Sequence, residues 1–270
     1  MVTKYLIACV TAVGVGTALS AAAWLGPGDG RAGTSRDTVS PRVPVLVELF
    51  TSEGCSSCPP ADTLLRQLDE TQPVAGAEVI VLSEHVDYWN RLGWTDPFSS
   101  ADFTARQEQY VTRLRAASLY TPQAVIDGAR EAIGNDRATV IAAVAAAAAQ
   151  PKGTLTVQVQ DAGDGALAVS VTGTVPGAAG ADVFVAVAER GLTVHVTGGE
   201  NARKTLRHTG VVRRLTRAGR IDAKGALDVS PVGVALDRTW QRQALRVVAF
   251  AQGKSGGPVS AIGVADVPVR

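Results

Sequence analysis

Two cysteines separated by two residues are the part of this sequence that most directly indicates chemistry. Cys55 and Cys58 follow an apolar run at residues 43–50, which is typical of a buried strand, and precede a helical pattern that begins near Pro59. A thiol reacts as its thiolate, and the amide dipoles at the start of a helix stabilise that anion. We therefore predict that Cys55 is the attacking thiol and that Cys58, one turn into the helix, resolves the mixed disulfide.

Two other interpretations of the cysteine pair stay open. In the first, the disulfide is structural, and the chain is a non-catalytic binding module that recognises a partner through its β-rich part. In the second, the reduced cysteines bind copper(I) or another soft metal, with His85 as a further ligand. In the favoured interpretation, an enzyme that exchanges thiols and disulfides, the disulfide itself carries the chemistry and no metal or other cofactor is expected.

The elements expected around the cysteines have the order of a thioredoxin core. Strands are expected at residues 43–50, 78–82, 123–126 and 129–133, and helices at residues 61–70, 101–117 and 139–150. Two right-handed crossovers and a closing hairpin would make a β-α-β-α-β-β-α domain. After residue 153 the pattern changes to short alternating strands with Gly-rich turns. The predicted fold class is therefore an α/β thioredoxin-like domain (43–151) followed by an all-β sandwich-like domain (152–270).

Thr121 and Pro122 stand just before the strand that opens the expected hairpin. In a thioredoxin core a proline at this point follows a cis peptide bond and faces the cysteine pair. We therefore predict a cis bond before Pro122, with the Thr121 backbone presented to a bound substrate strand. An ordinary trans proline at the start of a strand is the alternative.

Three further side chains are candidate accessories to the cysteines. His85 and Asp87 follow the second expected strand, so they should lie at the same sheet edge as the cysteines. His85 either stabilises a thiolate, shuttles a proton or is a hydrogen-bonded loop residue. Glu53, two residues before Cys55, is either a proton acceptor or a group that raises the cysteine pKa values.

The first residues have the pattern of an export signal. Lys4 precedes a long uncharged run that is mostly apolar, and small residues at 21–23 offer a cleavage site. Residues 1–26 are predicted to be a signal peptide or an uncleaved N-terminal anchor, and residues 27–42 a flexible linker. The predicted location is extracytoplasmic: the periplasm, the cell envelope or the medium. A membrane is expected as a partner only through an uncleaved N-terminal segment.

Composition narrows the range of partners. The chain has 270 residues, a net charge of +1 and 5% aromatic residues, which argues against a nucleic-acid surface. The expected partners are proteins that carry thiols or disulfides, together with an unidentified redox partner.

Several motifs together resemble one bacterial family. They are residues 47–62 around the cysteines, 85–89 (HVDYW), 92–94 (LGW), 106–107 (RQ), 120–123 (YTPQ) and 199–201 (GEN). The family is the thioredoxin-like group labelled domain of unknown function 1223, and the resemblance covers about residues 43 to 268. It implies an exported protein with a thioredoxin-like fold, and it implies no particular reaction. Asn90 departs from the pattern, since an aspartate is expected there.

Overall fold

The computed structural model describes residues 42–269 of the chain. The predicted signal or anchor (1–26) and most of the predicted linker (27–42) lie outside the described residues. Among the residues that are described, no helix is both long enough and apolar enough to cross a membrane.

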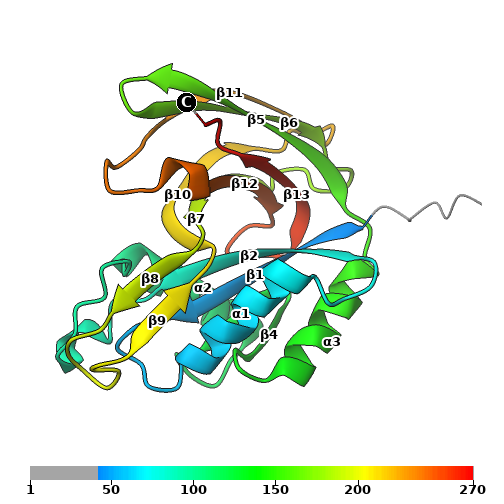
Figure 1. The fold of residues 1–270 in the computed structure, drawn as a ribbon. Helices are drawn as coiled ribbons and strands as arrows, with labels where there is room; N and C mark the ends of the chain where they lie inside the picture. The colour runs from blue at the N-terminus through cyan, green and yellow to red at the C-terminus, as the bar shows by residue number, and fades with distance from the viewer. Residues whose placement is uncertain (1–41, 270) are drawn as a thin grey trace, which may run out of the picture. The chain divides into compact units, whose positions relative to one another are not determined.

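Within residues 42–269 the chain forms three α-helices and thirteen strands (Figure 1). The helices are α1 (Pro59–Thr71), α2 (Ala101–Leu114) and α3 (Arg137–Ala148), with short 3-10 turns η1 (Asn90–Leu92) and η2 (Arg242–Ala244). The strands are β1 (Val43–Thr51), β2 (Ala77–His85), β3 (Gln123–Ile126), β4 (Arg130–Ile133), β5 (Gly153–Gly163), β6 (Ala166–Thr174), β7 (Asp182–Glu189), β8 (Leu192–His195), β9 (Thr205–His208), β10 (Val211–Arg220), β11 (Ala226–Ala235), β12 (Leu245–Gln252) and β13 (Val259–Asp266).

The helix that follows the cysteines begins for reasons visible in its sequence. Pro59 and Pro60 occupy its first turn, where backbone N–H groups have no partner inside the helix. Leu64, Leu65 and Leu68 form its buried face. The apolar stripe therefore fixes how α1 sits on the sheet, and with it the direction from which the helix start meets the cysteine loop.

The individual elements predicted from the sequence are confirmed, but the predicted assembly is wrong. Eleven strands in the described chain form one mixed sheet, in the order β11-β6-β5-β13-β12-β7-β10-β2-β1-β3-β4. The fold is therefore not a thioredoxin-like α/β domain followed by a separate β-sandwich. Strand β2 would otherwise leave an unpaired edge, and β10 pairs with that edge in parallel, Val211 opposite Ser83. The proposed division into domains at residue 151 stays a prediction.

The junction between β2 and β10 depends on a glycine. The Ser83 N–H donates to the Gly210 carbonyl oxygen at 2.7 Å. Gly210 has φ +61°, and a Cβ there would lie 2.6 Å from the Val81 carbonyl oxygen. Glycine is therefore required by both the backbone conformation and the close approach of the two strands.

Both faces of β1 and β2 are buried, in two different cores. Val47, Val81 and Leu49 face α1 and α3. On the opposite face, Leu46 and Leu82 pack in a cluster with side chains of α2, β7, β12 and β13. A further core lies among β5, β6, β7, β11, β12 and β13, where the sheet curves over itself (Figure 1). The cysteine-bearing half thus depends on the β-rich half for one of its two cores.

Strands β8 and β9 form a separate two-stranded hairpin that the sequence analysis did not predict. The hairpin leaves the sheet after β7 and returns to it at β10. The end of β9 lies against α1, because the Thr209 hydroxyl donates to the Asp69 carboxylate at 2.9 Å. This contact fixes the end of the hairpin to the last turn of α1.

Candidate functional site

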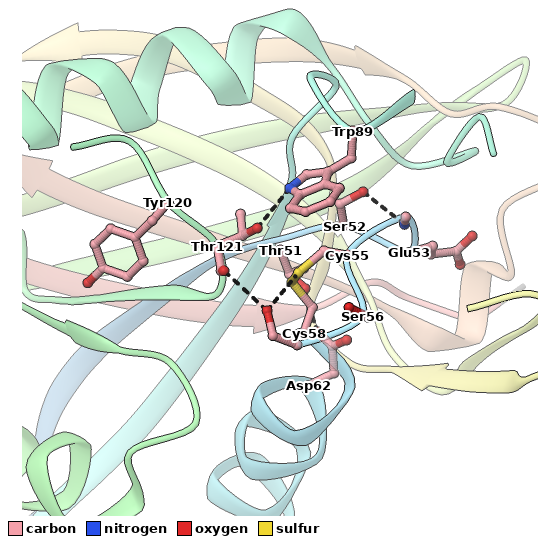
Figure 2. The surroundings of a disulfide bond; sticks show 12 residues. Thr51, Ser52, Glu53, Cys55, Ser56, Cys58, Asp62, Trp89, Tyr120 and Thr121 are labelled. Atoms are coloured by element: carbon pink, nitrogen blue, oxygen red, sulfur yellow. Dashed lines mark hydrogen bonds between the residues drawn. A yellow bond between two sulfur atoms is a disulfide. The ribbon is translucent and has the colours of Figure 1, made fainter. Parts of the chain in front are cut away.

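Cys55 and Cys58 are joined by a disulfide in the loop between β1 and α1 (Figure 2). Their Cα atoms are 5.5 Å apart, and Cys58 is the residue that immediately precedes α1. Both cysteines are 0% exposed, whereas Ser56 and Ser57 between them are exposed. Ser56 and Ser57 are therefore on the surface of the loop, and the two sulfur atoms are shielded from solvent.

The Thr121–Pro122 peptide bond is cis, as predicted, and it lies beside this loop. The Ser57 hydroxyl donates to the Thr121 carbonyl oxygen at 3.4 Å and is 3.3 Å from the Cys55 sulfur. On the other side, the Trp89 indole N–H donates to the Thr121 hydroxyl oxygen at 2.8 Å (Figure 2). The structure thus brings these predicted residues together, and the substrate-binding role of Thr121 and Pro122 stays a prediction.

The turn of the β8–β9 hairpin holds the cysteine loop from the opposite side. The buried Asn201 side chain donates to the carbonyl oxygens of Glu53 (2.8 Å) and Cys55 (2.9 Å). The neighbouring Glu200 carboxylate accepts the Ser56 N–H at 3.0 Å, and hydrogen bonding from Ser56 lowers the pKa of Glu200. Sequence reasoning gave these two residues no role, although they belong to the 199–201 motif of the family resemblance.

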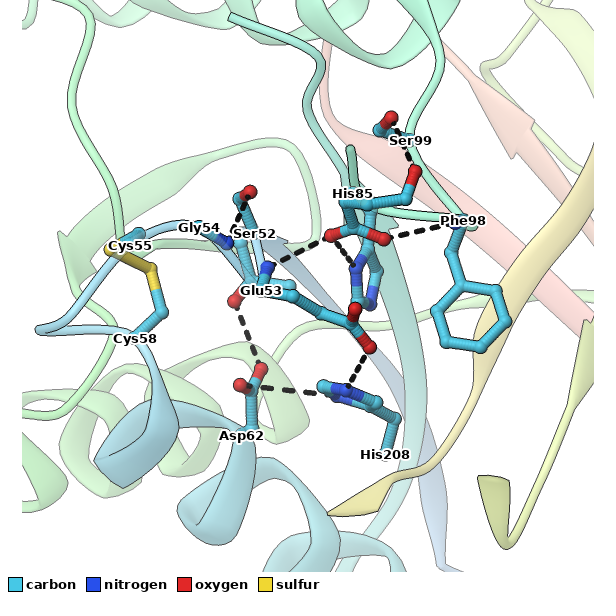
Figure 3. Close-up of polar contacts among 12 residues, drawn as sticks. Ser52, Glu53, Gly54, Cys55, Cys58, Asp62, His85, Phe98, Ser99 and His208 are labelled. Carbon is cyan, nitrogen blue, oxygen red and sulfur yellow. Dashed lines mark hydrogen bonds and ion pairs between the residues drawn. A yellow bond between two sulfur atoms is a disulfide. The ribbon is translucent and has the colours of Figure 1, made fainter. Parts of the chain in front are cut away.

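Behind the loop, five ionisable side chains are buried together (Figure 3). They are Glu53, Asp62, His85, Asp96 and His208. The Glu53 carboxylate is 3.1 Å from His208 Nε2, and His208 Nδ1 is 3.9 Å from the Asp62 carboxylate. We call these five side chains the buried acid–imidazole cluster.

Each carboxylate of the cluster has a neutral donor as well. The Trp94 indole N–H donates to the Glu53 carboxylate at 2.8 Å, and the Thr51 hydroxyl donates to Asp62 at 2.9 Å. Asp96 accepts the backbone N–H of Glu53 at 2.8 Å. The cluster is therefore joined to the cysteine loop through both the backbone and the side chain of Glu53.

His85 and Asp96 form an ion pair inside the cluster, with His85 Nδ1 2.7 Å from the carboxylate. Burial opposes the charge of His85, but Asp96, together with Asp62 and Glu53, outweighs it and raises the pKa of His85 above 6.5. Burial likewise opposes the charge of Asp96, but the His85 imidazolium lowers the pKa of Asp96 below 3.8. Burial raises the pKa of Asp62, with His208 as the largest opposing influence. Asp62 therefore holds a proton more readily than an ordinary aspartate.

The predicted accessory residues have different outcomes. Glu53 and His85 come together in the buried cluster, where His85 is engaged by Asp96. Asp87 does not belong to it: its carboxylate accepts the Thr104 hydroxyl at 2.6 Å and ties the loop to α2. Over residues 42–269, no group of three or more His, Cys, Asp or Glu side chains is arranged to hold a metal ion. The copper(I) alternative stays an untested prediction.

Sequence reasoning missed Asp62, Asp96 and His208. A signal existed for Asp62, since it follows Cys58 by one helical turn and lies among the leucines of an apolar stripe. No local signal existed for His208, which is 155 residues from Glu53.

Fold and site together define a class: a mixed-sheet protein whose CxxC disulfide at a helix start is backed by buried carboxylates and imidazoles. A family model described as "Protein of unknown function (DUF1223)" matches residues 46–252, so the chain belongs to this family. It is similar to the X-ray crystal structure of a structural genomics target from Agrobacterium tumefaciens. The two share 29% sequence identity over 86% of this chain and 99% of the other, with a TM-score of 0.61. A comparison with curated proteins found no match.

Proposed function

We propose that the protein is a thiol-disulfide oxidoreductase that acts outside the cytoplasm on protein thiols or disulfides. The observation that carries this proposal is the disulfide between Cys55 and Cys58, directly before α1. The aligned N–H groups of a helix start stabilise a thiolate, which is the reactive form of cysteine. Export is inferred from residues 1–26 and is part of the proposal.

The proposed exchange has two steps. In the reducing direction, the Cys55 thiolate attacks a substrate disulfide, forms a mixed disulfide and releases one substrate thiolate. Cys58 then attacks the Cys55 sulfur, which re-forms the internal disulfide and releases the second substrate thiolate. The substrate gains two electrons and the cysteine pair loses them, and the reverse sequence oxidises a substrate dithiol.

The surroundings favour approach from one side. Both cysteines are 0% exposed, so a substrate sulfur reaches Cys55 only when the loop at Ser56 and Ser57 opens locally. That loop lies between Thr121 on one side and Glu200 on the other. A substrate strand that approaches there meets the Thr121 backbone, in keeping with its predicted role in substrate binding.

Two matched variants and a potential test this function. We expect Cys55→Ser to abolish dithiol exchange, and Cys58→Ser to keep the first attack and accumulate the mixed disulfide, as measured by thiol trapping and mass spectrometry. The pair should equilibrate with glutathione at a potential of roughly −120 to −270 mV, the range of exchange enzymes. A potential below about −300 mV, or full activity of Cys55→Ser, would show that the disulfide is structural.

A further inference from the structure

The proposed second step requires Cys58 to lose a proton while it is shielded from water. Cys58 is 0% exposed in the described structure. A thiol attacks a disulfide only as the thiolate, so a buried thiol needs an internal group that accepts its proton. A base inside the protein is therefore required near Cys58, and the buried acid–imidazole cluster contains one.

Asp62 is in the right place on α1. Its backbone N–H donates to the Cys58 carbonyl oxygen at 3.1 Å, and Cys58 has helical dihedral angles of φ −78° and ψ −37°. Side chains four residues apart on a helix lie on the same face, with Cβ atoms about 5–6 Å apart. Figure 3 shows the Asp62 carboxylate on the side of α1 that faces His208 of β9. Cys58 and Asp62 thus lie on the same face of α1, and a hydrogen bond from Thr51 holds the Asp62 carboxylate.

A second ionisable side chain, His208, lies behind Asp62. His208 Nδ1 is 3.9 Å from the Asp62 carboxylate and has no hydrogen-bond partner among residues 42–269, although His208 is 1% exposed. The other ring nitrogen, Nε2, is 3.1 Å from the Glu53 carboxylate. The imidazole is therefore held by Glu53 with its second ring nitrogen facing Asp62, so His208 belongs to the immediate surroundings of that carboxylate.

We propose that Asp62 accepts the proton of the Cys58 thiol and that His208 is a positioning residue that sets the proton affinity of Asp62. The inference rests on the proposed exchange activity. When Cys58 attacks the mixed disulfide, its S–H bond breaks, the proton passes to the Asp62 carboxylate, and the sulfur electron pair forms the bond to Cys55. The electron pair of the broken disulfide bond leaves with the substrate thiolate. In the reverse direction, protonated Asp62 returns the proton to Cys58.

The charges around Asp62 suit this role. Burial raises the pKa of Asp62, which brings it closer to that of a thiol. The groups that face it are His208 at the end of β9, His85 at the end of β2, Thr51 on β1 and Asp96. His208 and His85 oppose the rise in pKa, whereas Asp96 adds to it.

The test separates the two steps by colour. The full chain carrying Cys9→Ala is reduced and mixed with dithiobis(nitrobenzoate), and each step of the exchange then releases one coloured thiolate in a stopped-flow instrument. The first phase reports attack by Cys55, and the second reports attack by Cys58. A reduced protein that releases no coloured thiolate would contradict the exchange activity and the proton path together.

We expect Asp62→Asn to leave the first phase unchanged and to slow the second phase by roughly a hundredfold, the size of a general-base contribution. His208→Gln should slow the second phase less, by about tenfold, and move its pH midpoint upwards, because the influence of His208 that lowers the pKa of Asp62 is lost. The double variant should be no slower than Asp62→Asn, since both substitutions act on one path.

Two control variants match these substitutions. Glu70→Gln removes an exposed carboxylate from the same helix, two turns further on, and His195→Gln removes an exposed imidazole from the same hairpin. Both should keep wild-type rates and pH profiles. If Asp62→Asn does not fold, Asp62→Ser replaces it. Second-phase rates for the Asp62 and His208 variants within about twofold of wild type from about pH 5 to pH 8 would overturn the proposal.

Discussion

The buried ion pair of His85 and Asp96 makes the stability of the fold depend on pH. The pKa of His85 is raised above 6.5, so the stabilisation by its protonated form is complete below pH 6.5 and is lost as the pH rises through the raised value. The pKa of Asp96 is lowered below 3.8, so its contribution is present above pH 3.8 and is lost as the pH falls through the lowered value. The pair therefore stabilises the fold most in the window between these two transitions.

This window gives a prediction for His85→Gln. The free energy of unfolding of the wild type should fall as the pH rises from 6.5 through the raised pKa of His85, and the fall should be absent in the variant. Asp96→Asn should cost about 3–5 kcal/mol near neutral pH, because it leaves a buried imidazolium without its partner. Urea unfolding at several pH values measures both effects, with His195→Gln as the exposed control. Parallel pH profiles for wild type and His85→Gln would contradict the assignment.

At the residue scale, the sequence predicted what is local and missed what is distant. Cys55, Cys58 and Pro122 were found because spacing and neighbouring elements identify them. Asn201 contacts the Cys55 carbonyl oxygen from 146 residues away, and nothing in its own neighbourhood indicates that contact. The sequence therefore indicated only part of the buried acid–imidazole cluster: Glu53 and His85 were candidate accessory residues, but Asp62, Asp96 and His208 were not.

At the scale of elements, α2 is anchored to the sheet by a buried arginine. The Arg106 guanidinium donates to Glu48 on β1 at 2.7 Å and to Gln252 on β12 at 3.1 Å, and it lies 3.4 Å from Glu84 on β2. Burial raises the pKa of Glu84 well above 4.5; the positive charge of Arg106 opposes this and the like charge of Glu48 adds to it. Glu84 therefore holds a proton more readily than an ordinary glutamate, and Glu48 is the carboxylate that lies closer to the Arg106 guanidinium.

Two substitutions in this cluster should have very different costs. Glu84→Gln replaces a carboxyl group whose pKa is raised with a neutral group of the same shape and should change the free energy of unfolding by about 1 kcal/mol or less. Arg106→Met leaves Glu48 buried without its cation and should cost about 3–5 kcal/mol. Denaturant unfolding of both variants measures the contrast. Equal losses would show that Glu84 is ionised in the folded protein.

Element positions were predictable because the apolar patterns are long and are bounded by turn residues. The β8–β9 hairpin was missed although its strands are as long as β3 and β4. Those two strands are joined by the turn signal Asp127-Gly128, whereas β8 and β9 are separated by the long segment 196–204. The hairpin nevertheless supplies His208 at the end of β9, and the segment between its two strands supplies Glu200 and Asn201. The element with the weakest pattern thus contributes three of the groups nearest the cysteine loop.

At the scale of the whole molecule, the described chain is held together by the single sheet that crosses from β2 to β10. The pattern of a strand shows which of its faces are buried, but it does not show which strand lies at each edge. The sequence analysis therefore predicted a thioredoxin-like domain and a separate β-sandwich, where the described chain forms one eleven-stranded sheet. The parallel run of β1 and β2 was visible, whereas the pairing of Ser83 with Val211 depends on a turn at Gly210 that no local rule indicates.

Gly210→Ala tests this junction against a matched control. Gly191 has φ +69°, and a Cβ added there would meet no atom of the described chain within 4 Å, whereas a Cβ at Gly210 would be 2.6 Å from the Val81 carbonyl oxygen. Both alanine variants should lose about 1–2 kcal/mol from the left-handed backbone. Gly210→Ala should lose a further 1–3 kcal/mol or so from the clash. Calorimetry and urea unfolding measure the difference between the two variants. Equal losses of unfolding free energy would mean that β2 and β10 relieve the clash at residue 210 without cost.

The contacts of Glu200 and Asn201 with the cysteine loop couple the docking of the hairpin to the redox state of the cysteines. The docked hairpin stabilises one conformation of that loop, so the oxidised and reduced forms of the cysteine pair bind the hairpin with different free energies whenever they differ in loop geometry. Linkage is reciprocal: whatever factor the thiol state imposes on docking, docking imposes on the thiol–disulfide equilibrium. A molecule that binds the hairpin, even far from the sulfur atoms, would then shift the reduction potential of the cysteine pair.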